Sequence, residues 1–234
     1  MPAEILLHEK LNTEITLRKG PPRERRLYGE TIVYSIFIVG IVSIYSFALG
    51  ADPTVRTLNR ILADVSFLLL GLSLVLSSLC YFFNFADKLI IFRKHLGVVG
   101  VAYMLVHMLI SFTYAGNTPL LSFFLAYHSI RSFIAASGST IIFVMMAVLS
   151  NRFSIQHIGP ARWRMIMRIG YIGYALGMIH FGLRGWDKWL LWMSGNSTLF
   201  PPFSFMIFLF GIVVICLRIA LFISVWRTHK KQTP

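Results

Sequence analysis

Charged residues are scarce in this chain of 234 residues. Asp, Glu, Lys and Arg together make up 13% of the sequence, whereas they make up about 25% of a typical soluble chain. Hydrophobic residues reach 56%, and 20 of the residues are Phe. Too little polar sequence remains to form a soluble enzyme with a membrane anchor, or a reductase with its own nucleotide-binding domain. The composition therefore indicates a membrane protein.

Acidic residues are especially few. The sequence has nine Asp and Glu but 22 Lys and Arg, which gives a formal net charge of +13. In a soluble chain such an excess would suggest a nucleic-acid partner. Here the basic residues lie between apolar stretches and form no single stripe. We therefore expect no nucleic acid, and the lipid bilayer as the surroundings of the chain.

Cysteine is almost absent, since the sequence has only Cys80 and Cys216. Both lie within apolar stretches, where a free thiol behaves as a small hydrophobic side chain. We expect both to be buried free thiols and no disulfide to form.

Apolar stretches of about 20 residues are the length that a membrane-spanning helix needs. No alternation of period two supports a barrel. The sequence thus predicts an all-α membrane protein with a bundle of six transmembrane helices. The predicted helices cover residues 30–49, 61–83, 96–114, 132–149, 169–183 and 202–226, and the fifth is short unless it extends past Trp186 or back to Arg164.

Basic residues predict how the bundle is oriented. Sixteen of the 22 Lys and Arg lie before the first predicted helix or after the second, fourth and sixth, which places them on one side. Cytoplasmic loops carry this excess, so both termini are predicted to be cytoplasmic. Residues 1–26 then form a polar N-terminal tail, 27–226 the membrane domain and 227–234 a basic C-terminal tail. Trp186, Trp189 and Trp192 follow the fifth helix and are predicted to lie at the headgroup layer.

Two histidines lie well inside apolar helices, where a polar ring needs a partner. His107 is 13 residues beyond Lys94, and His180 is 12 residues beyond Arg168. Both helices run outward, so at about 1.5 Å per residue the two rings lie at matching depths, roughly 18–20 Å from the inner face.

Two imidazoles at one level are what a bis-histidine haem requires. Neighbouring glycines would leave room for a flat macrocycle, namely Gly97, Gly100, Gly170, Gly173 and Gly177. The same glycines could instead serve close helix contacts, with the histidines hydrogen-bonding across the bundle. A proton or metal pathway is a third interpretation.

Two runs of residues resemble the ferric reductase-like transmembrane domain family, and within it the haem-binding membrane subunit of the bacterial methionine sulfoxide reductase system. The resemblance covers about residues 30–226. The first run is Arg93-Lys94-His95-Leu96-Gly97 with Tyr103 and His107, and the second is Ser150-Asn151-Arg152 with Gly159, Trp163, Arg168, Tyr171 and His180-Phe181.

This resemblance implies an oxidoreductase component in a bacterial inner membrane, with one haem b per chain and His107 and His180 as axial ligands of its iron. Electrons would pass outward from a cytoplasmic-side donor, either a flavin (FAD or FMN) or a quinol. The acceptor would be an outer-side oxidoreductase subunit or a metal chelate. A cytoplasmic flavin reductase is a candidate partner.

Several arginines are candidates for binding anionic groups. Arg131, where the resembling subunit also has a basic residue, is a candidate for the haem propionates. Arg93 and Arg168 could hold flavin phosphates, although positive-inside sorting explains them equally well. Arg218 lies within the sixth predicted helix, where either a buried anion or snorkelling to the surface would explain it.

One departure from the family concerns a second haem. The resembling subunit has a histidine on helix five where this chain has Met167, and His95 lies near the same level on helix three. A His95/Met167 haem is an alternative, because His/Met ligation occurs. The simpler expectation is one haem in the outer half.

The competing hypothesis is a non-redox multi-pass membrane protein, either a transporter or an assembly factor, with structural intramembrane histidines. A transporter would show broken helices or repeat symmetry, and the sequence shows neither.

Overall fold

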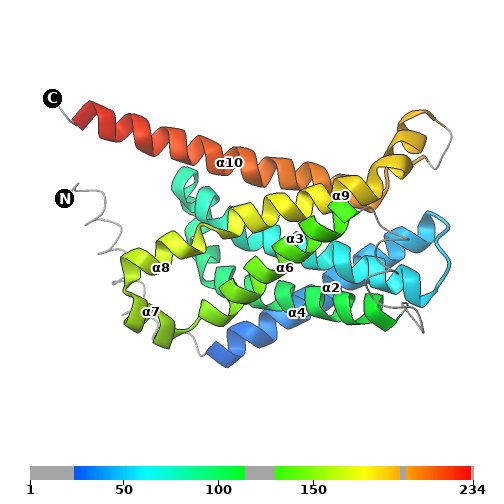
Figure 1. Cartoon of the computed structure of the whole chain (residues 1–234), viewed down its shortest axis with the longest axis horizontal. Helices are drawn as coiled ribbons and strands as arrows, with labels where there is room; N and C mark the ends of the chain where they lie inside the picture. The colour runs from blue at the N-terminus through cyan, green and yellow to red at the C-terminus, as the bar shows by residue number, and fades with distance from the viewer. Residues whose placement is uncertain (1–23, 114–129, 196–198, 233–234) are drawn as a thin grey trace.

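The computed structural model describes residues 24–113, 130–195 and 199–232, and within these ranges the regular structure is entirely helical (Figure 1). The elements in chain order are α2 (Glu24–Ala48), α3 (Val55–Phe82), the 3₁₀ helix η1 (Asn84–Phe92), α4 (Arg93–Thr113), α6 (Ile130–Leu149), α7 (Arg152–Ile158), α8 (Pro160–Met167), α9 (Gly170–Met193) and α10 (Phe203–Gln232).

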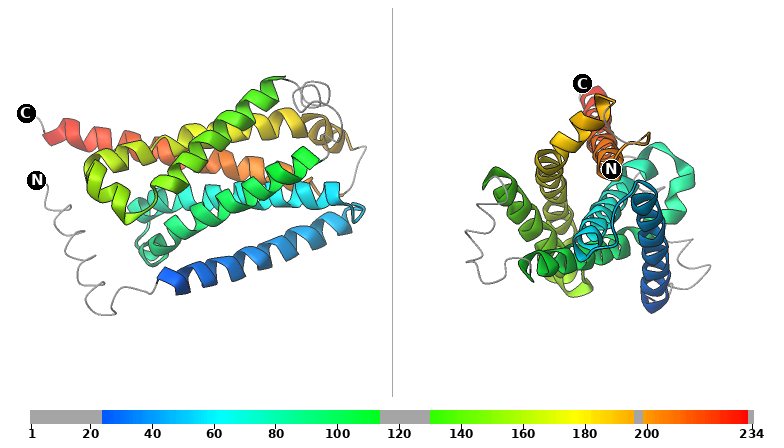
Figure 2. Two further views of the ribbon diagram at one scale, coloured as in Figure 1. Left: turned by 60° about the horizontal axis from the view of Figure 1, so that its bottom comes forward. Right: turned by 90° about the vertical axis from the view of Figure 1, so that its right-hand side faces the viewer.

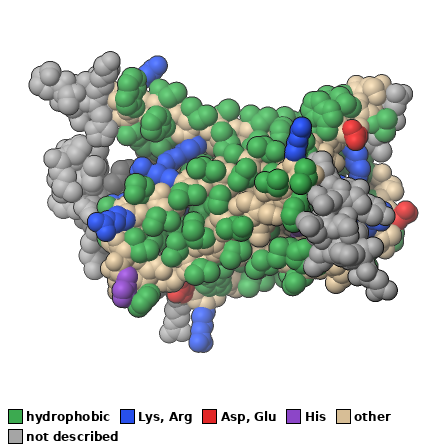
Figure 3. Space-filling view, viewed as in Figure 1, with side chains coloured by type: hydrophobic (Ala, Val, Ile, Leu, Met, Phe, Trp, Pro, Cys, Tyr) green, Lys and Arg blue, Asp and Glu red, His purple; other side chains and the backbone are tan. Residues whose placement is uncertain are grey.

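Six helical segments are long and apolar enough to cross a bilayer, and each contains or closely matches one of the predicted stretches. Apolar side chains cover most of the face shown in Figure 3, with charged side chains mainly toward its two ends. The fifth helix continues past Trp186 to Met193, which gives it the length that residues 169–183 lack. The chain is therefore an integral, multi-pass membrane protein.

The extension of α9 changes the environment of its tryptophans. Trp189 is only 2% exposed, and its indole nitrogen donates to Ser204 Oγ at 3.2 Å. Its ring also packs against Phe205 and Phe208 of α10. Trp189 thus stabilises the contact between α9 and α10, whereas Trp186 is exposed.

Helix α3 is the centre of the bundle and contacts α2, α4, α9 and α10 (Figure 2). Its Val65 and Leu69 pack with Val42 of α2 and Val99 of α4, while its Phe67 packs with Tyr174 of α9. Helix α6 completes the bundle by packing on α9 and α4.

One end of the bundle, which we call the basic end, contains the start of α2, the end of α3, the short helices α7 and α8, and the end of α10 (Figure 1). Helices α3 and α6 begin at the opposite end. Most of the predicted N-terminal tail lies outside the described residues, and α10 extends to Gln232 through most of the predicted C-terminal tail.

The structure shows both cysteines as free thiols, but Cys216 is exposed on α10, so its predicted burial is wrong.

The glycines of the helix-three and helix-five stretches receive side chains from neighbouring helices. A Cβ built on Gly177 would lie 2.5 Å from the ring of Phe67, one on Gly173 2.8 Å from Ile142, and one on Gly100 3.1 Å from Leu70. These contacts support the interpretation that the glycines serve close helix packing, because neighbouring side chains fill the space beside each of them.

A matched pair of glycine substitutions tests this packing. Gly177→Ala should lower the free energy of unfolding by about 1–3 kcal/mol, because Phe67 is stacked between two other rings and cannot easily move. Gly40→Ala on α2, where no neighbour lies within 4 Å of the added Cβ, should leave stability unchanged or raise it by up to about 1 kcal/mol. Unfolding in detergent micelles measures both, and an equal response of the two variants would contradict the packing.

Candidate functional site

His107 of α4 is held against the first turns of α3. Its Nδ1 lies 2.9 Å from the main-chain oxygen of Asn59 and 2.9 Å from Asn59 Oδ1. Asn59 Nδ2 donates to Ser111 Oγ at 2.9 Å, and Ser111 Oγ donates to the main-chain oxygen of His107 at 2.8 Å. Asn59 therefore contacts the imidazole directly, and Ser111 links the Asn59 side chain to the main chain of α4.

His180 of α9 is held in the same way by the first turn of α6. Its Nδ1 lies 2.9 Å from Ser132 Oγ and 3.1 Å from the main-chain oxygen of Ser132. Ser132 is 1% exposed, so this contact lies inside the bundle.

A main-chain carbonyl can only accept a hydrogen bond, so Nδ1 of each ring is the donor. In a neutral imidazole the lone pair then lies on Nε2, which is the nitrogen through which such a tautomer ligates a metal ion. Metal-ligating histidines commonly donate their other N–H to a carbonyl in this manner. Because Asn59 and Ser132 both belong to the beginnings of their helices, the two rings lie near the same end of the bundle, opposite the basic end.

Aromatic rings fill the core beside His180. Phe181 stacks on Phe67 with centroids 4.7 Å apart, and Phe67 stacks on Tyr174 at 4.2 Å. These rings belong to the same apolar cluster as Leu70 and Phe143, which line a cavity nearer the basic end. The core is therefore continuous from the histidine level to that cavity.

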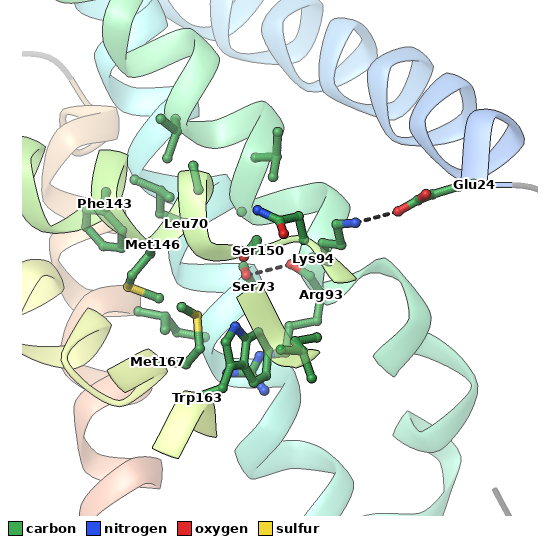
Figure 4. Close-up of a pocket in the computed structure, with 17 residues that line it drawn as sticks. Glu24, Leu70, Ser73, Arg93, Lys94, Phe143, Met146, Ser150, Trp163 and Met167 are labelled. Atoms are coloured by element: carbon green, nitrogen blue, oxygen red, sulfur yellow. Dashed lines mark hydrogen bonds and ion pairs between the residues drawn. The ribbon is translucent and has the colours of Figure 1, made fainter. Parts of the chain in front are cut away.

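The cavity, which we call the inner cavity, has a volume of about 310 Å³ and lies between α3, α4, α6 and α8. Figure 4 shows Phe143, Met146 and Met167 on one side of it and Arg93 and Lys94 on the other. Lys94 forms an ion pair with Glu24, and the main-chain oxygen of Arg93 accepts a hydrogen bond from Ser73 Oγ at 2.7 Å. The indole of Trp163 donates to the main-chain oxygen of Leu149 at 2.9 Å and so is fixed at the rim. The result is an apolar space with cations at one wall.

The structure distributes the predicted arginines over both ends. Arg131 is exposed at the first turn of α6 and directly precedes Ser132, the residue that contacts His180. Arg93 lines the inner cavity, whereas Arg168 is exposed and lines a separate groove beside α10.

His95 and Met167 are not brought together. The ring of His95 is buried against Tyr28 of α2, with centroids 4.5 Å apart, and its Nδ1 lies 3.0 Å from the main-chain oxygen of Ile91. Met167 lines the inner cavity, whose lining does not include His95. The two residues that a second haem would need therefore face different neighbours.

Asn59 and Ser132 were not among the residues predicted from the sequence. Each is a polar residue in the first turns of an apolar helix, a position where capping and solvation usually explain such side chains. The histidine that each one contacts lies on another helix, and spacing along one chain does not reveal that pairing.

Two curated relatives cover most of the chain. The protein-methionine-sulfoxide reductase haem-binding subunit MsrQ of Rhizobium meliloti (strain 1021) is 26% identical over 174 residues, which is 71% of this chain and 78% of that protein. The subunit of the same name from Agrobacterium fabrum (strain C58) is 25% identical over 169 residues, or 69% of this chain and 77% of that protein. No family model matches the chain. The similarity to this haem-binding subunit expected from the sequence motifs is confirmed.

Proposed function

We propose that this chain is a b-type haem protein that passes electrons across the membrane, with His107 and His180 as the axial ligands. The observation that carries the proposal is the paired geometry of the two rings, each of which donates from Nδ1 to the carbonyl oxygen at the start of a neighbouring helix. Two relatives named as haem-binding subunits support it.

The donor set fits a haem. Two neutral imidazoles on different helices would hold the haem iron, and their main-chain acceptors fix the tautomer and orientation of the rings. When bound, the haem supplies the one-electron chemistry, while the protein supplies orientation and an apolar surrounding. Arg131, beside the partner of His180, is the cation we assign to the haem propionates. His95 and Met167 remain packing residues, which gives one haem per chain.

The inner cavity is the proposed position of the electron donor. Its size lies at the lower end of the range of small-molecule sites, which is about 300–1,000 Å³. The apolar walls suit the ring of a flavin or a quinol, and Arg93 and Lys94 at the rim suit an anionic or electron-rich oxygen. Arg168 would meet the phosphates of a flavin only at the surface. A cytoplasmic flavin reductase would be the partner if the donor is FAD or FMN.

The acceptor is proposed to lie at the opposite end, where His107 and His180 are held. The relatives are named as subunits of a reductase of methionine sulfoxide in proteins. By that similarity the acceptor is an oxidoreductase subunit, and a metal chelate is the alternative.

The basic end is proposed to face the cytoplasm of a bacterial inner membrane, with both termini inside and residues 27–226 forming the haem-binding domain. The positive-inside rule supports this orientation. Electron flow would then run from the cytoplasmic leaflet outward.

The ligand assignment is tested by replacing each histidine. His107→Ala and His180→Ala should each remove the haem signal from a dithionite-reduced minus oxidised spectrum without preventing membrane insertion. His157→Ala, at an exposed histidine of α7, is the matched control and should keep one haem per chain. Met167→Leu should keep it as well.

Retained haem in both ligand variants would refute the proposal and favour a non-redox role for the histidines. Loss of half of the haem in Met167→Leu would instead show that a second haem is present.

The positioning role of Asn59 predicts a shift in reduction potential. Asn59→Leu removes one of the two oxygens that accept from His107 Nδ1, which makes the imidazole less basic and stabilises ferric iron less. The midpoint potential should therefore rise while haem content stays constant. Ser111→Ala, which perturbs the same network without touching Nδ1, is the control and should leave the potential unchanged. Equal potentials in both variants would contradict the assignment.

Orientation is tested by labelling single cysteines in a variant without Cys80 and Cys216. Asp52→Cys, in the turn before α3, should react with a membrane-impermeant maleimide from outside intact cells. Ala161→Cys, exposed on α8 at the basic end, should react only after permeabilisation. The reverse pattern would overturn the proposed topology.

A further inference from the structure

A second hollow lies beside the inner cavity and opens to the outside of the bundle. This groove has a volume of about 360 Å³ and runs between α8, α9 and α10 at the basic end. Four arginines line it, and we call it the arginine groove: Arg93, Arg164, Arg168 and Arg218.

The charges of the groove lack counterions in the described part of the chain. None of the four arginines forms an ion pair with a described carboxylate. Arg93 and Arg218 lie close enough for their positive charges to repel each other. Arg93 and Arg218 are half-buried, and holding two like charges close together without a counterion raises their electrostatic energy. The groove is therefore electrostatically complementary to an anion.

Arg218 of α10 lines the groove, and its side chain reaches across to α9. Its guanidinium carbon lies 4.7 Å from the ring centre of Tyr171. Tyr171 is itself fixed, because its hydroxyl donates to the main-chain oxygen of Leu74 at 2.8 Å. This ring contact holds the guanidinium at the groove.

The other wall of the groove is apolar and faces outward. Leu221, Phe222 and Val225 follow Arg218 on α10, and Phe222 is 69% exposed. A small inorganic anion would leave this wall uncovered, whereas a lipid would cover it with hydrocarbon. Basic pockets between helices near the cytoplasmic surface are typical sites for anionic headgroups.

From this combination we propose that the arginine groove is a specific binding site for an anionic phospholipid. Its phosphate contacts the arginines, led by Arg218, and its hydrocarbon covers the apolar wall of α10. Guanidinium groups suit a phosphate because they donate two parallel hydrogen bonds. The site is separate from the histidines and does not depend on the proposed electron transfer.

Native mass spectrometry of the purified, delipidated full chain tests the proposal. Dioleoyl phosphatidylglycerol and dioleoyl phosphatidylcholine, added at equal concentrations, share their acyl chains and differ in headgroup charge. We expect retained adducts with phosphatidylglycerol only. Arg218→Gln and Arg164→Gln should each weaken this binding about tenfold. Arg56→Gln, exposed at the opposite end, removes the same charge and should leave binding unchanged.

Several outcomes would overturn the site. Equal retention of both lipids would show ordinary surrounding lipid, and unchanged binding in both groove variants would place the lipid elsewhere. Displacement of phosphatidylglycerol by inorganic phosphate or FMN at equal concentration would show a soluble anion as the occupant. If Arg218→Gln fails to fold, Arg164→Gln still decides, because Arg164 is exposed. Haem content measured on the same samples separates the two proposals, since lipid binding can be lost while haem is retained.

Discussion

The packing of α3 among four other helices is the constraint on which the rest of the structure depends. Along this one helix, Asn59 orients His107, Phe67 stacks in the aromatic core, Leu70 and Ser73 line the inner cavity, and Ser77 reaches the arginine groove. A shift of α3 along its axis would therefore move all of these contacts together. Side chains seated against glycines, such as Phe67 against Gly177, resist that shift because close-packed interiors have no room to adjust.

The hydrogen-bonded histidines and the two arginine-lined hollows lie at opposite ends of the bundle. At the end opposite the basic end, each ring donates from Nδ1 to a main-chain carbonyl oxygen. At the basic end, guanidinium and ammonium groups gather around two hollows. Arg93, Trp163 and Met167 line both hollows, so the inner cavity and the arginine groove share a wall. Whatever occupies one of them lies next to the contents of the other.

Hydropathy and residue spacing predict much of this architecture. The six helices and the matching position of His107 and His180 follow from apolar length and from counting residues, because a bilayer leaves the backbone few alternatives to helix. The buried environment of Trp189 could not be predicted, since it depends on Ser204, Phe205 and Phe208 of the next helix. The same limit applies to the partners of the two histidines. Residue spacing gives depth along one helix, whereas the rotation of that helix is decided by its neighbours, as the separation of His95 from Met167 shows.

The acceptors of the two imidazoles include main-chain oxygens, and this has a consequence for how such a chain can diverge. A substitution at position 59 or 132 changes a side chain but leaves the carbonyl in place, provided that the helix still begins there. The backbone therefore fixes which ring nitrogen carries the proton, and substitutions of the surrounding side chains do not change it. Evolution can vary the side chains beside the histidines, and thereby the hydrogen bonds to Nδ1, without having to rebuild the site.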